Sequence, residues 1–259
     1  MATPVLKIDN LTKRFGGLTA VDNLSLSLAS GRLHAIIGPN GAGKTTLFNL
    51  ISGFIPADSG RVELLGRDIS GLQTYRINRL GMARTLQIKS VFNKMSVEDN
   101  LWIAVQARTG NFNPLRKAAS FGATRDKVHA LLEEIGLERH ARRDAGTLSY
   151  GDIALLELGI ALASEPRLLL LDEPICGMSP GETASTVNKI RELSAKVDII
   201  IIEHDMEVVF DIAEDIIVMA QGAMLARGAP REISQNPLVR EAYLGQPDED
   251  DVSGLAAHA

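Results

Sequence analysis

Two spacings of hydrophobic residues along the chain predict its secondary structure. Alternating apolar and polar residues at 5–9 and 21–28 predict strands with one buried face, and the stretch between them is expected to be a loop. Continuous apolar runs at 168–171 and 199–202 predict strands that are buried on both faces of a parallel sheet. Residues at helical spacing lie between these two runs and would supply the crossover from one parallel strand to the next.

The chain between these strand-rich parts is predicted to be largely helical, and Ser96 is expected to cap one of its helices. We therefore expect an α/β fold with a mainly parallel sheet, an N-terminal antiparallel β subdomain and an inserted α-helical subdomain. The α/β core is assigned to residues 1–87 and 164–245, and the helical subdomain to 88–163. The tail 246–259 carries a run of acids followed by small residues, and we expect it to be disordered.

The composition is ordinary for a globular protein and excludes several classes. Apolar residues make up 45% of the 259 residues, yet no run approaches the length of a membrane-spanning helix. The N-terminus lacks a basic segment followed by an apolar one, so no signal peptide is expected. Cys176 is the only cysteine, which rules out an intrachain disulfide and fits a reducing cytoplasm. A net charge of −5 argues against a nucleic-acid-binding face.

The stretch Gly38–Thr46, with the sequence GPNGAGKTT, fits the G-x-x-x-x-G-K-[ST] pattern of a phosphate-binding loop. An expected strand precedes it and an expected helix follows it, which is the context that the motif requires. Glycines let successive N–H groups point into one concavity, and the helix adds its own N–H groups and the positive end of its dipole. Lys44 is expected to reach the β- and γ-phosphates, and the Thr45 hydroxyl to bind Mg²⁺. The loop residues expected to bind the nucleotide are Asn40, Gly41, Ala42, Gly43, Lys44, Thr45 and Thr46.

Two acids, Asp172 and Glu173, follow the apolar run at 168–171. An acidic residue at the carboxyl end of a buried strand lies where α/β sheets bind their ligands. Asp172 can bind Mg²⁺, as in a Walker B element, and Glu173 can orient and polarise the attacking water. The alternative is a pair of solvated carboxylates, because spacing along the sequence does not show that they lie near the phosphate loop.

The segment Leu148–Asp152, with the sequence LSYGD, precedes an apolar helix that leads to Asp172. It resembles the signature sequence of ABC-type ATPases, which is commonly Leu-Ser-Gly-Gly-Gln. Other positions match motifs of that family in the right order: Phe15 in the adenine-stacking loop, Gln87 at the Q-loop, Cys176–Pro180 at the D-loop, and His204 after the next strand. The resemblance extends from residue 5 to about 245 and implies a RecA-like P-loop NTPase core.

The signature departs from its common form at Tyr150 and Asp152, which stand where Gly and Gln are frequent. An acid at the start of a helix suits the helix dipole. Under the resemblance, however, Asp152 would lie near a γ-phosphate, where like charges repel. Ile153 and Ala154 follow where polar and basic residues are usual, which removes charge from a face that the resemblance places near a dimer interface.

The resemblance implies that two copies of the chain, or this chain and a paralogue, bind two ATP molecules between them and hydrolyse them. Ser149 and Gly151 of one subunit would close on the γ-phosphate held by the other, and Phe15 would stack on adenine. His204 would contact the γ-phosphate and steady Glu173 and its water. The implied catalytic residues are Glu173, His204, Lys44 and Gln87, and the implied metal ligands are Thr45, Gln87 and Asp172.

Three stretches, 83–87, 202–206 and 236–245, most resemble the ATPase subunits of branched-chain amino acid importers. The implied function is that of an ATP-driven motor subunit at the cytoplasmic face of the inner membrane, for branched-chain amino acids or related small solutes. The implied partners are a second ATPase subunit, transmembrane permease subunits and, indirectly, a periplasmic solute-binding protein. No nucleic-acid partner is expected.

Three other classes of function can be compared with this one from the sequence. The ATPase of an ABC exporter or of a lipopolysaccharide-transport system has the same motor and stays open as an alternative. A GTPase would carry Asn-Lys-x-Asp, and neither Asn93-Lys94 nor Asn188-Lys189 is followed by that pattern. A P-loop ATPase acting on nucleic acid would need a basic, aromatic-bearing track, yet aromatics are only 4% of the chain.

Overall fold

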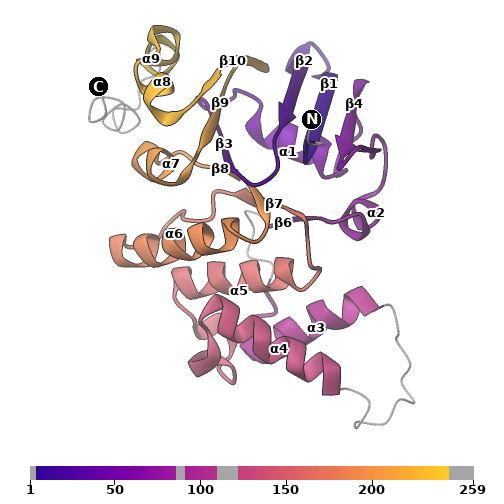
Figure 1. The fold of residues 1–259 in the computed structure, drawn as a ribbon, viewed down its shortest axis with the longest axis vertical. Coiled ribbons are helices and arrows are strands. Elements are labelled where there is room, and N and C mark those ends of the chain that lie inside the picture. The colour runs from indigo at the N-terminus through magenta and orange to yellow at the C-terminus, as the bar shows by residue number, and fades with distance from the viewer. Residues whose placement is uncertain (1–3, 86–90, 110–121, 245–259) are drawn as a thin grey trace. The chain divides into compact units, whose positions relative to one another are not determined.

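The structure is a computed structural model of the chain, shown in Figure 1. It describes residues 4–85, 91–109 and 122–244. The chain divides into two compact units: Met1–Arg84, Arg167–Glu173 and Arg191–Ala259 form the first, and Thr85–Pro166 and Pro174–Ile190 form the second. Among the described residues, no helix combines the length and the apolar character that crossing a membrane requires.

The first unit contains a six-stranded sheet in the order β10-β9-β3-β8-β7-β6. Neighbouring strands from β9 to β6 run parallel, and β10 is antiparallel to β9. The strands are β3 (Leu33–Ile37), β6 (Met82–Arg84), β7 (Leu168–Asp172), β8 (Asp198–Ile202), β9 (Asp215–Ala220) and β10 (Ala223–Gly228). Every residue of β3, β7 and β8 is buried, as the continuous apolar runs predict.

The register of the parallel strands brings three chain segments to one edge of this sheet. Ile36 of β3 and Asp172 of β7 both pair with Ile202 of the intervening strand β8. The residues that follow these three strands therefore leave the sheet side by side. This carboxyl-terminal edge is where open α/β sheets bind ligands.

The first unit also contains an antiparallel sheet in the order β2-β1-β4-β5. Its strands are β1 (Leu6–Phe15), β2 (Leu18–Leu28), β4 (Ser59–Leu64) and β5 (Arg67–Asp68). The loop expected between β1 and β2 is wrong, because pairing continues as far as Phe15 opposite Leu18. Register shifts after Ile8 interrupt the apolar alternation, and Asn10 lies at a φ of 50°. Because these bulges interrupt the alternation of apolar and polar residues, the sequence pattern does not show that the strand continues.

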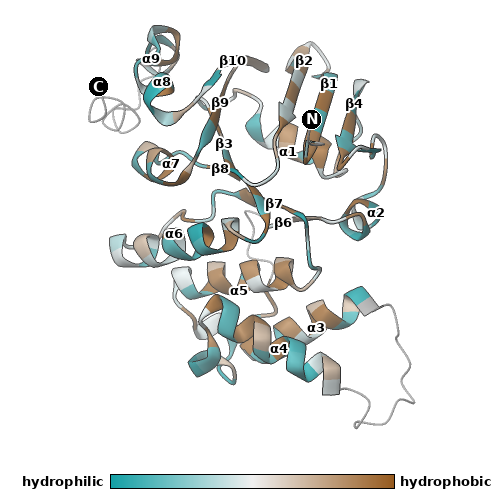
Figure 2. Ribbon diagram, in the orientation of Figure 1, coloured by the Kyte–Doolittle hydropathy of each residue, from teal (hydrophilic) through white to brown (hydrophobic). Residues whose placement is uncertain are grey.

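The helices of the first unit pack around these sheets. They are α1 (Lys44–Ile51), α2 (Thr74–Arg79), α7 (Met206–Ile212), α8 (Pro230–Ser234) and α9 (Pro237–Leu244). One hydrophobic core joins residues of both sheets to the buried face of α1, where Phe48 is fully buried. In Figure 2 the brown of hydrophobic residues runs along α1 and the strands beside it.

The second unit, taken by itself, is helical among its described residues. Its helices are α3 (Val97–Thr109), α4 (Gly122–Ile135), α5 (Tyr150–Leu162) and most of α6 (Pro180–Ser194), with short 3-10 turns at Glu138–His140 and Ala145–Thr147. As predicted, Ser96 caps α3, and its hydroxyl accepts the Asp99 N–H at 3.0 Å. Helices α3, α4 and α5 pack on one another, and a Cβ at Gly159 would lie within 3 Å of Leu101 and Ile135. The mainly parallel sheet, the antiparallel sheet and the helices together confirm the predicted α/β fold.

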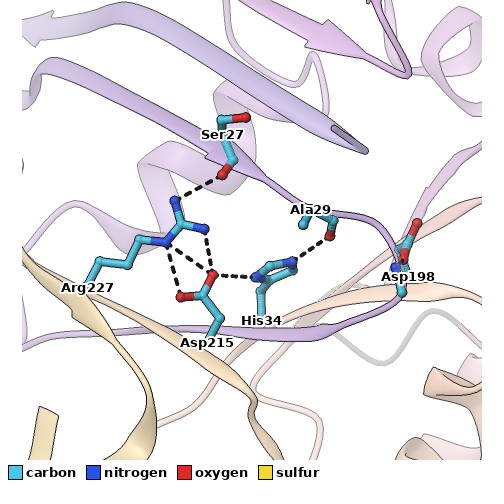
Figure 3. Close-up of polar contacts among 7 residues, drawn as sticks. Ser27, Ala29, His34, Asp198, Asp215 and Arg227 are labelled. Atoms are coloured by element: carbon cyan, nitrogen blue, oxygen red, sulfur yellow. Dashed lines mark hydrogen bonds and ion pairs between the residues drawn. The ribbon is translucent and has the colours of Figure 1, made fainter. Parts of the chain in front are cut away.

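A buried polar cluster ties the amino-terminal ends of the parallel strands together (Figure 3). His34 at the start of β3 is fully buried, with Nδ1 2.8 Å from Asp215 Oδ2 and Nε2 2.9 Å from the Ala29 carbonyl. Arg227 of β10 donates to both oxygens of Asp215 and, at 2.9 Å, to the carbonyl of Ser27 in β2. The cluster therefore joins the central strand, the sheet edge and the antiparallel sheet.

The carboxyl of Asp215 titrates abnormally because of these contacts. Burial alone would raise its pKa, but the hydrogen bonds from His34 and Arg227 and the charge of Arg227 outweigh burial and hold the pKa well below its ordinary value of 3.8. A group with a lowered pKa in the folded protein stabilises the fold above its unfolded pKa. That contribution is lost as the pH falls below about 4, toward the folded pKa.

We predict that Asp215→Asn lowers the free energy of unfolding at pH 7 by about 2–3 kcal/mol, because His34 and Arg227 lose a shared charged acceptor. The variant should also lose the part of the acid sensitivity below pH 4 that Asp215 supplies. Urea unfolding at pH 7 and at pH 3 measures both effects. Asp211→Asn is the control, since its ion pair with Arg191 is exposed and should contribute less than about 1 kcal/mol. Equal losses in the two variants would contradict the assignment.

Candidate nucleotide-binding site

The phosphate loop begins where β3 ends and closes against neighbouring backbone. Gly38 lies at a φ of 151°, and a Cβ there would fall 2.1 Å from the Met219 carbonyl oxygen. Gly43 lies at a φ of 99°, and a Cβ there would fall 2.2 Å from the Ala20 carbonyl oxygen. Both positions therefore require glycine, for the backbone angle and for the space. The glycines fix the loop between β2 and β9.

The remaining loop residues lie around the start of α1. Gly43 is the residue before the helix, the Leu47 N–H donates to its carbonyl at 2.8 Å, and Lys44 is the first helical residue. Lys44 is buried, and its Nζ donates to the carbonyls of Gly38 and Pro39. Of the other loop residues expected to bind nucleotide, Ala42 is buried, Gly43 and Thr46 are half-buried, and Asn40, Gly41 and Thr45 are exposed.

Asp172 at the end of β7 is held by a buried arginine. Arg84 Nη2 donates to Asp172 Oδ2 at 2.7 Å, and the two side chains are only 7% and 1% exposed. The other terminal nitrogen of Arg84, Nη1, donates to Asn49 at 2.8 Å and to Ser52 at 3.0 Å, both at the end of α1. The rings of Phe48 and Phe54 each lie 5.4 Å from the guanidinium. Arg84 thus fixes the acid to the helix that follows the phosphate loop.

Arg84 is a site residue to which the sequence alone assigns no role. It appears there only within a stretch that resembles importer ATPases. The one signal in the sequence is an arginine directly after two apolar residues, where a buried cation needs an anion. Nothing in the sequence names that anion, because Asp172 is 88 positions away.

Glu173 and His204 meet at the same edge of the sheet. They follow the adjacent strands β7 and β8, and the Glu173 N–H donates to the Ile202 carbonyl at 2.9 Å. His204 Nε2 lies 2.7 Å from Glu173 Oε1, and both side chains are partly exposed. Glu173 has a φ of 50°, in the left-handed region that few non-glycine residues adopt. Backbone strain of this kind is concentrated at functional sites.

A divalent cation would fit beside Asp172. Oδ2 is bound by Arg84, whereas Oδ1 is buried and has no hydrogen-bond partner among the described residues. No group of three or more His, Cys, Asp or Glu side chains in that part of the chain could hold a metal. Mg²⁺ in nucleotide sites needs no such group, since it binds one or two carboxylates together with substrate phosphates and water.

The signature segment lies in the second unit, at the start of α5. Ser149 is the N-cap residue, and its hydroxyl accepts the Asp152 N–H at 3.2 Å. Tyr150 is exposed and Asp152 is half-buried, while Ile153 and Ala154 are buried. Gly151 donates its N–H to Glu182 at 3.2 Å, within the same unit. Glu182 is a second residue to which the sequence alone assigns no role.

Of the two remaining predicted site residues, the structure describes only Phe15. Phe15 ends β1 with its side chain 48% exposed, and Lys13 Nζ lies 5.5 Å from the centre of its ring. An exposed ring face of this kind can stack on a base. Gln87 lies outside the described residues, as does the tail 246–259.

The parallel sheet, the glycine loop at its carboxyl edge and the paired acids define a P-loop nucleotide-binding domain. Comparison with known proteins places the chain within that class. Residues 21–176 match the family model described as ABC transporter, and residues 223–249 match one described as branched-chain amino acid ATP-binding cassette transporter. The chain belongs to the ABC transporter ATPase family.

Individual relatives are similar over nearly their full length. The chain is 42% identical to LivG of Salmonella typhimurium, named a high-affinity branched-chain amino acid transport ATP-binding protein, over 95% of this chain and 100% of LivG. It is 40% identical to BraF of Pseudomonas aeruginosa, of the same printed function, over 95% and 100%. Among solved structures, the ADP conformation of MJ1267, an ATP-binding cassette of an ABC transporter, superposes with a TM-score of 0.83 at 32% identity, covering 95% of this chain and 100% of MJ1267.

We predict that Arg84→Gln lowers the free energy of unfolding by about 3 kcal/mol, because it leaves Asp172 as a buried charge without its cation. Urea unfolding at pH 7 measures the change. Arg61→Gln is the control: Arg61 pairs with Glu63 and Asp68, but its side chain is 54% exposed, so its loss should change stability by less than about 1 kcal/mol. A loss below about 1 kcal/mol in both variants would show that Arg84 does not hold the acid in place.

Proposed function

We propose that this chain is the ATP-binding and ATP-hydrolysing motor subunit of an ABC importer for branched-chain amino acids or related small solutes. The observation that carries the proposal is the meeting of Glu173 and His204 beside Asp172, at the sheet edge that also carries the phosphate loop. The importer assignment is supported by LivG and BraF, each of which matches 95% of the chain.

The phosphate loop and Asp172 would bind the nucleotide and its metal. Lys44 would turn from the loop carbonyls to the β- and γ-phosphates, and the loop N–H groups would surround them. Thr45, Gln87 and Asp172 would hold Mg²⁺, which neutralises charge on the transferred phosphoryl group. The unpartnered Oδ1 of Asp172 supports this role. Phe15 would stack on adenine.

Glu173 and His204 would act on the attacking water. Glu173 Oε1 faces His204 Nε2, so the carboxylate is oriented from the neighbouring strand and its other oxygen can accept a proton from water. His204 would contact the γ-phosphate while holding the carboxylate. The hydrogen bond between them makes a pair of the general base and its positioning group.

The site is completed, in this proposal, by a second ATPase subunit. Ser149 and Gly151 of that subunit would donate to the γ-phosphate, and the reciprocal contact would close a second site. The second subunit is another copy of the chain or a paralogue. Permease subunits would hold the pair at the cytoplasmic face of the inner membrane, and a periplasmic solute-binding protein would deliver the solute to the permease.

The proposal assigns different roles to two parts of the chain. Residues 1–87 and 164–245 would form the ATP-binding core, and 88–163 the helical subdomain that carries the signature. Gln87 would link the nucleotide site to this subdomain and so to the permease.

We predict that Glu173→Gln binds ATP but hydrolyses it at least about 100-fold more slowly, because the amide cannot accept the proton from water. Steady-state phosphate release measures turnover, and a fluorescent ATP analogue measures binding. Glu138→Gln is the matched control, because it makes the same chemical change in an exposed 3-10 turn of the second unit and should leave turnover unchanged. Near wild-type turnover in Glu173→Gln would contradict the role assigned to the carboxylate.

Import can be separated from export by the partners that bind. Co-purification of the chain with a permease, followed by ATP-dependent uptake that requires a periplasmic solute-binding protein, is the expected result. ATP-dependent transport of solute out of the cell, with no uptake, would favour the exporter alternative.

A further inference from the structure

Glu182 in the first turn of α6 bridges two helix N-termini of the second unit. Its Oε2 accepts the Ser179 N–H at 3.0 Å and the Ser179 hydroxyl at 2.7 Å. Its Oε1 accepts the Gly151 N–H at 3.2 Å, in the signature segment at the start of α5. The Glu182 carboxylate therefore accepts hydrogen bonds both from the segment before α6 and from the signature segment.

The bond from the Ser179 N–H to Glu182 is the glutamate half of a capping box, in which a glutamate three residues into a helix accepts the N–H of the N-cap residue. A capping box does not require the bond to Gly151. The packing is also close on that side, since a Cβ at Gly151 would lie 3.0 Å from Glu182 Cβ. The contact between Glu182 and Gly151 is therefore independent of the helix cap, and it is where α6 packs against the signature segment.

The chemistry of the contact is that of an anion site. Hydrogen bonds from Ser179, from the Gly151 N–H and from the Ser149 hydroxyl lower the pKa of Glu182 to about 2, so it is ionised at neutral pH. The donors at the signature, a serine hydroxyl and a glycine N–H at a helix N-terminus, equally suit a phosphate oxygen.

We propose that Glu182 is an internal substitute for the γ-phosphate, which holds the Ser149 and Gly151 donors until a nucleotide-bearing partner subunit displaces it. The inference rests on the proposed function, in which those same donors close on ATP across the dimer. Because the carboxylate and the γ-phosphate are both anions, they compete for the donors and repel each other. Glu182 is therefore a positioning residue that weakens the association of ATP-loaded subunits.

The test measures ATP-dependent dimerisation by sedimentation velocity in a full-length Glu173→Gln background, where hydrolysis is slow. Glu182→Gln keeps the side-chain size and an oxygen that can cap α6, but removes the charge. We expect the variant to dimerise about three- to tenfold more tightly in saturating ATP, as the loss of one competing charge-assisted hydrogen bond implies. An unchanged or weaker dimer would overturn the proposal.

Ser179→Ala is the matched control. It removes the hydroxyl that bonds to Glu182 Oε2 while leaving the charge and the contact with Gly151. It should weaken the cap, as thermal denaturation would show, without tightening the dimer. Equal tightening in both variants would assign the effect to the cap and overturn the proposal. A Glu173→Gln parent that does not dimerise with ATP refutes the proposed function and this inference together, whereas a dimerising parent with an unresponsive Glu182→Gln refutes the inference alone.

Discussion

The buried ion pair between Arg84 and Asp172 connects the parts of the nucleotide site. Arg84 ends one strand, Asp172 ends the strand beside it, and the guanidinium reaches across to the end of α1 through Asn49 and Ser52. A buried pair of this kind adds little net stability over an apolar packing, but breaking one half of it is costly. Its contribution is geometric: Arg84 binds one oxygen of Asp172, and the other oxygen has no hydrogen-bond partner among the described residues.

The acidic side chains at the two ends of the parallel strands differ in how many of their oxygens are hydrogen-bonded. At the amino-terminal ends, Asp198 accepts hydrogen bonds from Ser30 and Gly31. Asp215 is shared there by His34 and Arg227, as Figure 3 shows. Such acids are satisfied within the chain and serve the fold. At the carboxyl-terminal edge one oxygen of Asp172 is left without a partner among the described residues. The acids at the two ends of the strands thus differ in whether the protein itself satisfies both of their oxygens.

The sequence predicts the parallel strands and the phosphate loop better than it predicts the antiparallel sheet. Apolar runs and the glycine loop identified β3, β7 and β8 and the acids after them, because parallel strands and phosphate loops have strong patterns. The loop expected before β2 was wrong, because bulges near Asn10 break the alternation that marks a strand. The contacts of Arg84 with Asp172 and of Glu182 with Gly151 could not be predicted, since such partners are set by folding and leave no local pattern.

At Glu173 the backbone conformation and the proposed chemistry favour different residues. Its φ of 50° is the conformation of a glycine or an asparagine, and holding a glutamate there costs on the order of 1 kcal/mol. The chemistry proposed for this position nevertheless needs a carboxylate. A stability screen that ignored turnover would accordingly favour glycine at residue 173, so this position is one where improving the fold and keeping the activity are opposed.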